Sequence, residues 1–247
     1  MTDLAGRTAL VTGATAGIGR AVAERLAEHG AEVVVHGRDA QRGAALVAEI
    51  AERGGRARFV AADLTDAKDV ERLAAEAGPV DILVNNAGLY EFTPTPGTSV
   101  DSFDRHLAIN TRAPFQLVAA LAPGMAKRGH GTIVNVSSTA ATSVAPVGAA
   151  YGASKAALET LTRYWATEFG PAGLRVNGVS SGPVRTPGTA PLLAAVGDAM
   201  DQVNARGRIG DPEEIADVVL FLVGDHSSYV NGAMVSVHGG ERSLLPG

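Results

Sequence analysis

Short apolar runs alternate with longer amphipathic runs along the whole of this 247-residue chain, and this alternation constrains the fold more than any other feature. Several short runs, such as VVV at 33–35, ILV at 82–84 and TIVNV at 132–136, are apolar at nearly every position. Strands of that kind are typical of a parallel sheet that helices cover on both faces. The alternation therefore predicts a doubly wound α/β fold with seven parallel strands.

The expected strands lie at 8–12, 32–36, 58–61, 82–85, 132–137, 175–180 and 234–237, and the expected helices near 17–29, 39–53, 66–77, 99–126, 150–169 and 211–223. No Pro/Ser/Gly-rich linker or internal repeat divides the chain, so we expect one domain over 1–247. The segment 186–210 interrupts the alternation. It is apolar and long for a connection, which is typical of a functional segment such as a lid over a substrate.

Composition excludes several classes of protein. The formal charge is −5 and no long basic run is present, so a nucleic-acid partner is not expected. No apolar run approaches the ~18 residues of a membrane helix. The first residues, MTDLAGRTALVTG, lack a charged-then-apolar leader, and the chain has no cysteine, which together predict a cytoplasmic location. The six histidines show no metal-binding spacing, so no metal is expected and each is interpreted as structural or solvated.

A glycine-rich run, Thr12-Gly-Ala-Thr-Ala-Gly-Ile-Gly19, joins the first expected strand to the first expected helix. Glycines at such a junction let the backbone turn tightly and approach a pyrophosphate, which binds at the helix N-terminus. The spacing is Gly-x-x-x-Gly-x-Gly rather than the more familiar Gly-x-Gly-x-x-Gly. The alternative is an ordinary turn, but the position in an α/β chain favours a dinucleotide site.

Three further strand ends would line the same crevice, because ligands bind beside the carboxyl ends of parallel strands. Gly37-Arg38 offers no carboxylate for a ribose, and the guanidinium of Arg38 can pair with a 2′-phosphate, unless it only completes a surface turn. Asp63-Leu64 offers a carboxylate to adenine, unless Asp63 caps the next helix. Asn85-Asn-Ala-Gly88 is read as crevice lining, or else as turn chemistry.

Tyr151 and Lys155 stand one helical turn apart, and Ser138 precedes them at an expected strand end. A nearby cation favours the ionised form of a phenol, so this pair predicts a tyrosine able to pass a proton near neutral pH. Alone, the pair would more often be ordinary helix surface. Asn110 lies four residues before Pro114 within an expected helix. It is either a polar residue at a kink or a group that holds a water near Lys155.

Together, these motifs resemble the short-chain dehydrogenase/reductase family, in its 3-oxoacyl-reductase-like branch, over essentially the whole chain. The resemblance rests on the ordered set of residues 12–19, 85–88, Asn110, Ser138, Tyr151-x-x-x-Lys155, Asn177 and Gly182-Pro-Val-x-Thr186. It implies a Rossmann-type domain in which Tyr151 is the catalytic acid/base and Ser138 positions the substrate oxygen. It also implies that Lys155 lowers the Tyr151 pKa and holds the nicotinamide ribose, and that Asn110 completes a proton relay.

The same resemblance, together with the strand ends above, gives the expected NADP(H) site: Gly13, Thr15, Gly17, Ile18, Gly19, Arg38, Asp63, Leu64, Asn86, Ala87, Gly88, Tyr151, Lys155, Gly182, Val184 and Thr186. Two positions depart from the family pattern. Ser181 replaces a proline, which would add a hydroxyl near the substrate, and His238 replaces an aspartate, which leaves the C-terminal subunit contact open.

We therefore expect an NADPH-dependent reductase that acts on a small-molecule ketone, or on a secondary alcohol in reverse. An NAD-dependent alcohol dehydrogenase of the same fold and a non-catalytic NADP-binding regulator are the alternatives. The resemblance also implies a homotetramer, with the helices near 99–126 and 150–169 at one interface. Trp165 is either an anchor of that interface or part of the monomer core.

Overall fold

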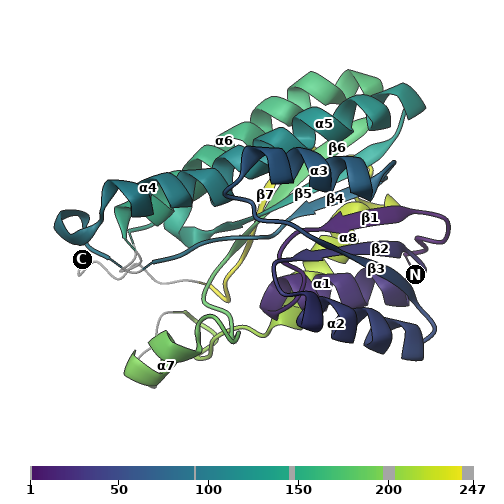
Figure 1. Ribbon diagram of the computed structural model, residues 1–247. Helices are drawn as coiled ribbons and strands as arrows, with labels where there is room; N and C mark the ends of the chain where they lie inside the picture. Colours follow the sequence, from purple (N-terminus) through teal and green to yellow (C-terminus); the bar gives the residue numbers. More distant parts are fainter. Residues whose placement is uncertain (1, 92, 145–147, 197–203, 241–247) are drawn as a thin grey trace.

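The computed structural model describes residues 2–91, 93–144, 148–196 and 204–240 (Figure 1). Seven parallel strands form one sheet in the order β3-β2-β1-β4-β5-β6-β7. The winding direction reverses between β1 and β4, and a crevice for a ligand opens at such a point. The strands are β1 Thr8–Val11, β2 Glu32–Gly37, β3 Arg56–Ala61, β4 Ile82–Asn85, β5 Gly131–Ser138, β6 Leu174–Ser181 and β7 Met234–Val237.

Helices cover both faces of the sheet (Figure 1). One face is covered by α1 Gly17–Glu28, α2 Ala40–Glu52 and α8 Pro212–Val223. The other is covered by α3 Ala67–Ala77, α5 Ala113–Arg128 and α6 Ala149–Phe169, and α4 Val100–Leu107 packs beside α6. A π-helical turn, η2 Ala108–Arg112, joins α4 to α5. Short 3-10 turns are η1 Thr95–Gly97, η3 Thr139–Ala141, η4 Gly170–Ala172 and η6 Asp225–Ser227.

Local sequence explains where the helices begin and end. Asp39 precedes α2 and accepts hydrogen bonds from the backbone amides of Gln41 and Arg42, which otherwise have no partner in the first turn. Asp211 forms a capping box with Glu214 at the start of α8. Gly129 ends α5 in the left-handed region, at φ 77°.

The apolar strands lie between the two helical layers and form the core. Leu10, Val34 and Leu83 face one layer, while Val33 and Val84 face the other. Trp165 on α6 is only 4% exposed and lies beside Phe115, with ring centroids 6.3 Å apart. The interpretation of Trp165 as an interface anchor is therefore wrong, because its side chain is already buried in the monomer core.

All seven predicted strands are confirmed, each to within two residues. The predicted helix at 99–126 is in fact α4, η2 and α5 in succession, ending at Arg128. The segment 186–210 contains a helix that the sequence pattern did not predict, α7 Ala190–Val196. Figure 1 shows α7 apart from the sheet and its helical layers. Within the described residues, none of the helices is both long and apolar enough to cross a membrane.

Candidate active site

A cavity of about 860 Å³ opens at the carboxyl ends of the strands. All of the residues predicted to bind the cofactor line this cavity, together with the predicted catalytic residues Ser138, Tyr151 and Lys155. Asn110 does not line it and lies behind the wall, fully buried. The cavity is therefore lined by residues that follow six of the strands, β1 to β6.

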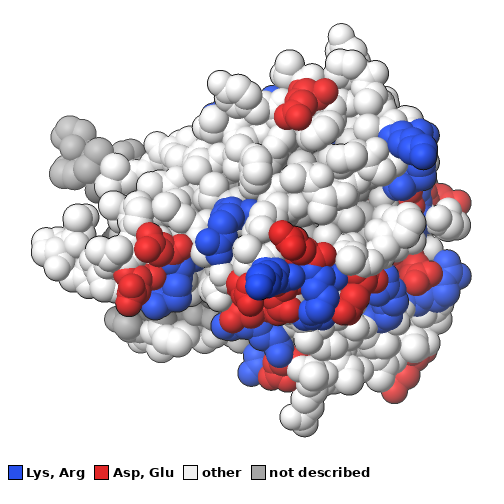
Figure 2. Space-filling model, turned by 45° about the horizontal axis from the view of Figure 1, so that its top comes forward, with Lys and Arg blue, Asp and Glu red and all other residues white. Residues whose placement is uncertain are grey.

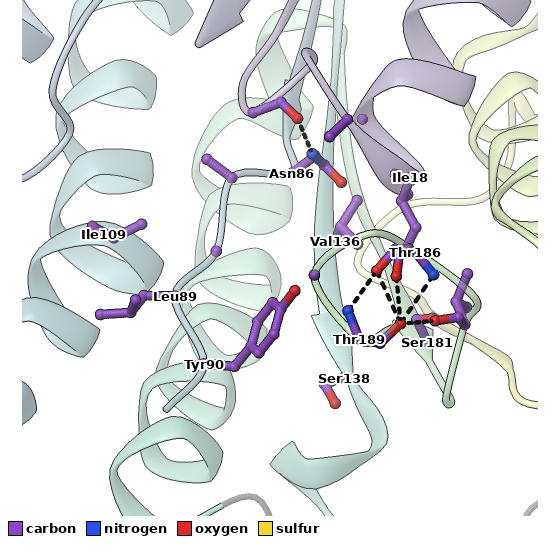
Figure 3. A pocket seen from close by; sticks show the side chains of 18 of the residues that line it. Ile18, Asn86, Leu89, Tyr90, Ile109, Val136, Ser138, Ser181, Thr186 and Thr189 are labelled. Carbon is purple, nitrogen blue, oxygen red and sulfur yellow. Dashed lines mark hydrogen bonds between the residues drawn. The ribbon is translucent and has the colours of Figure 1, made fainter. Parts of the chain in front are cut away.

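The glycine-rich loop is bonded tightly to the end of β4. The Thr12 hydroxyl accepts hydrogen bonds from the amides of Asn86 and Ala87, at 3.0 and 3.1 Å. The Asn86 side chain donates to the Thr12 carbonyl in return, at 2.9 Å. It also lies 3.2 Å from the Gly13 carbonyl, to which it donates a second hydrogen bond (Figure 3). Gly13 has φ +63°, and a Cβ there would stand 2.8 Å from the Ala87 Cα. The contact between the two loops is therefore possible only for glycine.

The start of α1 is suited to an anion. Ala16 stands at its N-cap and offers no side-chain hydrogen bond to the first amides of the helix. Those amides carry the positive end of the helix dipole and face the cavity, so they fit a pyrophosphate group. This geometry agrees with the dinucleotide site that the sequence predicted.

His36 supports the loop from the end of β2. The Gly13 amide donates to His36 Nδ1 at 3.1 Å, and His36 Nε2 lies 3.1 Å from the Ala62 carbonyl. Burial lowers the pKa of His36, which favours the neutral ring that can accept from Gly13. The sequence pattern indicated a structural histidine, and His36 is one.

The end of the cavity beside β2 and α2 carries two cations. Arg38 and Arg42 both line it, and Arg42, on the first turn of α2, was not foreseen. The Arg42 guanidinium forms an ion pair with the Asp39 carboxylate at 3.3 Å, which partly neutralises its positive charge. Gly37 has a packing role that the sequence did not reveal, because a Cβ there would stand 2.6 Å from Thr15 Cγ2.

Asp63 has a local role besides lining the cavity. Its Oδ1 accepts hydrogen bonds from both the amide and the hydroxyl of Thr65, each at 2.9 Å. Asp63 does not cap α3, since the N-cap is Asp66, whose side chain accepts from the Lys68 amide. The cap alternative is thus wrong, and the carboxylate of Asp63 remains at the cavity wall.

Ser138 ends β5, and Tyr151 stands opposite it on the first turn of α6. Their side chains are hydrogen-bonded, yet burial has the larger effect and raises the pKa of Tyr151 to about 12. Lys155, one turn further along α6, donates to the Val136 carbonyl at 2.8 Å. The three groups therefore meet at one point on the cavity wall, where an oxygen atom of a substrate can reach both hydroxyls.

The expected effect of Lys155 on Tyr151 is not found among the chain's own residues. The Lys155 Nζ atom lies 6.0 Å from the centre of the Tyr151 ring, and its own pKa is lowered to about 8 by burial. The pKa of Tyr151 is raised rather than lowered, so the predicted direction was wrong. The physical reason is that Lys155 is buried and Tyr151 is partly buried, and desolvation disfavours the charged form of each.

Asn110 lies within the π-helical turn η2 and is fully buried. Its side chain accepts from the Leu89 amide at 2.8 Å and donates to the Leu89 carbonyl and to Ser154 Oγ, both at 2.9 Å. These bonds use its amide group, so a water near Lys155 would have to bind the Asn110 main-chain carbonyl. Of the two interpretations, a structural role for the side chain is the one that these contacts support.

The two departures from the family pattern lie side by side. The Ser181 hydroxyl donates to the Gly182 carbonyl at 2.9 Å, so its hydrogen is used locally. Gly182 lies directly against His238, and its amide donates to the Val237 carbonyl at 3.0 Å. Both substitutions therefore act on the same junction of β6 and β7, below Val184 and Thr186.

An apolar chamber adjoins Ser138 and Tyr151. Its walls come from the β4 end, η2, η3 and the segment that leads into α7: Leu89, Tyr90, Ile109, Ala140, Pro187 and Leu193. Figure 3 shows Tyr90 projecting into the cavity, opposite Thr186 and Ser138. The sequence analysis missed Tyr90, although its place two residues after the Asn-Asn-Ala-Gly run was a usable signal. Among the described residues, His, Asp and Glu form no cluster that could hold a metal ion.

Known proteins are similar to this chain in sequence and in fold over nearly their whole length. A family model described as Enoyl-(Acyl carrier protein) reductase matches residues 13–241. Cyclohexanol dehydrogenase of Rhodococcus sp. (strain TK6) is 40% identical, over 97% of this chain and 98% of its own length. A solved structure described as a short chain dehydrogenase/reductase family protein is 50% identical with a TM-score of 0.90, covering 96% of this chain and 98% of that one.

The chain belongs to the short-chain dehydrogenase/reductase family. Both the predicted resemblance and the predicted fold class are thus confirmed, and the protein is an oxidoreductase that transfers hydride between a nicotinamide cofactor and a ketone or alcohol. A 3-oxoacyl (acyl-carrier-protein) reductase from Agrobacterium tumefaciens C58 has a TM-score of 0.92 at 33% identity, covering 96% of this chain and 95% of that one, and has NADP bound.

Proposed function

We propose that this protein is an NADPH-dependent reductase of small hydrophobic ketones, which also oxidises the matching secondary alcohols. The observation that carries the proposal is the meeting of Ser138, Tyr151 and Lys155 at the border between a dinucleotide cleft and an apolar chamber. When bound, the nicotinamide cofactor supplies the hydride in reduction and accepts it in oxidation. The glycine-rich loop, Arg38, and the ends of β3, β4 and β6 would hold this cofactor.

The two hydroxyls of Ser138 and Tyr151 bind the carbonyl oxygen and orient the carbonyl carbon. Tyr151 is protonated at neutral pH because burial raises its pKa to about 12, so it holds the proton that a ketone oxygen needs on reduction. Lys155 presents an ammonium group 6.0 Å from the centre of the phenol ring and would hold the ribose hydroxyls of the cofactor. A water on the main-chain carbonyl of Asn110 would return the proton from solvent. The apolar walls keep bulk water from the reacting atoms.

The first test removes the proton donor. We expect Tyr151→Phe to keep NADPH binding and to lower turnover of cyclohexanone by about 10²–10⁴, the range usual for general acid–base catalysis. Tyr229→Phe is the matched control, because the Tyr229 side chain is fully exposed. Near-full activity of Tyr151→Phe, measured by NADPH absorbance, would contradict the mechanism. A wild-type protein that binds NADPH but turns over no ketone would support a regulator instead.

The second test concerns the choice of cofactor. A charge-assisted bond from Arg38 to a 2′-phosphate is worth about 1.5–3 kcal/mol, or roughly one to two decades in affinity. We expect Arg38→Ala to lower kcat/KM with NADPH at least about tenfold and to leave NADH nearly unchanged. Arg42→Ala should have a smaller effect, because Asp39 already pairs with that guanidinium. Equal losses with both cofactors would mean that Arg38 stacks on the adenine, and a wild-type preference for NADH would favour the NAD-dependent alcohol dehydrogenase.

The substrate proposal rests on the chamber and is independent of the cofactor. Its walls are apolar, which suits a hydrophobic ketone. Small cyclic and linear ketones are therefore the first substrates to assay, with acyl-carrier thioesters as comparison. A cytoplasmic location and a homotetramer complete the proposal. The resemblance to the family and the exposed aromatic side chains on α4, α5 and α6 support the latter. Figure 2 shows a broad area with few charges on the side of the molecule that it brings forward.

A further inference from the structure

Tyr90 is a second phenol in the active-site cavity, and the proposed mechanism does not use it. It follows the Asn-Asn-Ala-Gly run at the end of β4, and its ring lies 6.3 Å from that of Tyr151 in an edge-to-face arrangement of 78°. The side chain is half-buried, and burial raises its pKa above that of a free phenol. Tyr90 therefore remains a neutral hydroxyl that can donate or accept a hydrogen bond at any physiological pH.

The Tyr90 hydroxyl reaches across the cavity to the loop that follows β6. It is hydrogen-bonded to the side chain of Thr186. The same oxygen is seated against Gly188, where any Cβ would collide with it. Figure 3 shows Tyr90 coming from the β4 side of the cavity and Thr186 from the opposite side. The Tyr90 side chain thus links the β4 side of the cavity to the loop that follows β6.

The loop that Tyr90 contacts is itself a bonded unit. The Thr189 hydroxyl lies 3.1 Å from Thr186 Oγ1 and donates to the Val184 carbonyl at 2.7 Å, and the Thr189 amide donates to Thr186 Oγ1 at 3.1 Å. On its other side Thr186 lies against Gly17 of the glycine-rich loop. Because these hydrogen bonds join Val184, Thr186 and Thr189, a contact that holds the Thr186 side chain in place also restrains the turn that leads into α7.

We propose that Tyr90 is a positioning residue that holds the Val184–Thr189 turn in its place over the cofactor cleft. The inference rests on the proposed function, because Thr186 is one of the residues expected to hold NADP(H). Tyr90 does not touch the transferred proton or hydride in this scheme. It acts through Thr186, whose hydroxyl it orients, and through the close fit of its oxygen on Gly188. Loss of the hydroxyl should weaken cofactor binding more than it slows chemistry.

The first experiment compares Tyr90→Phe with Tyr229→Phe, a control whose ring is fully exposed. We expect Tyr90→Phe to raise the Kd for NADPH, measured by fluorescence titration without substrate, by about three- to tenfold, the effect of one lost hydrogen bond. The KM for NADPH should rise in parallel, while kcat at saturating cofactor stays within about threefold. Tyr229→Phe should match the wild type.

The second experiment is a double-mutant cycle with Gly188→Ala. In the wild-type background the new methyl group collides with the Tyr90 oxygen, so NADPH affinity should fall by at least about tenfold. With Tyr90→Phe the nearest remaining ring atom is Cζ, 3.0 Å from that methyl group, and a small shift of the ring relieves the contact. The further loss from Gly188→Ala should then be about threefold or less. A merely structural effect at either site would give additive losses.

The outcomes separate this inference from the proposed function. A wild-type protein that neither binds NADPH nor reduces a ketone contradicts the proposed function itself. A wild type that is active, with Tyr90→Phe indistinguishable from Tyr229→Phe or with an additive cycle, contradicts only the role of Tyr90. If Gly188→Ala does not fold, Thr186→Val takes its place in the cycle. Adding Tyr90→Phe to Thr186→Val should then cause no further loss, and a further full loss would overturn the inference.

Discussion

At the scale of single residues, the buried ammonium group of Lys155, which the proposed mechanism needs, lowers the free energy of unfolding at neutral pH. Its side chain is 3% exposed, and burial lowers its pKa from 10.5 to about 8. Between those two values the unfolded chain binds one more proton than the folded protein, so the free energy of unfolding rises with pH in that window. Below pH 8 the folded protein bears the full cost of a desolvated ammonium.

We therefore expect Lys155→Met to abolish activity and to stabilise the fold at pH 7, by on the order of 1–3 kcal/mol after the lost bond to Val136 is allowed for. The gain should shrink as the pH rises from 8 towards 10.5, because the wild-type lysine then becomes neutral. Urea unfolding at several pH values measures this. Lys127→Met, at an exposed position near the end of α5, is the control and should show no such pH dependence. A pH-independent difference would rule out the assigned cause.

The residue types of the site could be read from the sequence, but their electrostatics could not. Ser138, Tyr151 and Lys155 were placed correctly on the cavity wall because strand ends and helix spacing fix their positions. The pKa of Tyr151 was expected in the wrong direction, since it depends on burial, which a motif does not reveal. Tyr90 was missed for a similar reason, because its contact with Thr186 joins segments almost a hundred residues apart.

At the scale of elements, η2 is a π-helical turn that fixes the wall of the substrate chamber. Asn110 in this turn pairs with both the amide and the carbonyl of Leu89. Asn110→Ala would leave these buried groups without partners, so we expect the free energy of unfolding to fall by about 2–4 kcal/mol. Urea unfolding at pH 7 measures the change. Gln116→Ala, one to two turns later, should cost less than about 1 kcal/mol, because the Gln116 bond to Ala67 is long, at 3.5 Å. Equal effects of the two substitutions would contradict this account.

Hydrophobic periodicity predicted one helix at 99–126 and could not reveal the π-helical turn within it. The π-helical turn changes the spacing of the apolar residues at one point only, and a period taken over the whole segment does not locate that point. Pro114 alone does not locate it either. The strands were predicted well because most of them are rich in apolar and β-branched residues, and the largest error, two residues, is at the start of β3, which carries Arg56 and Arg58. The helix α7 escaped prediction because it is short and lies away from the sheet, so no buried face marks its period.

At the scale of the whole molecule, the outer surface of α4, α5 and α6 is unlike that of a typical monomer. Three aromatic side chains are exposed there: Phe103 by 42%, Phe115 by 50% and Tyr164 by 71%. In Figure 2, which brings the top of Figure 1 forward, a broad area carries few charges, and positive and negative residues mix in a separate band. Exposed apolar area of this kind is typical of a surface that contacts another protein.

We expect the protein to form a homotetramer that uses these helices as one interface, although Trp165 does not take part. Light scattering at micromolar concentration should give about four times the chain mass. The double variant Phe115→Asp/Tyr164→Asp should dissociate at least to dimers, since two carboxylates would be buried without partners at the interface. Ala44→Asp, on the exposed surface of α2 across the sheet, is the control and should remain tetrameric. A wild type that scatters as a monomer, or a double variant with unchanged mass, would show that these aromatic side chains do not hold subunits together.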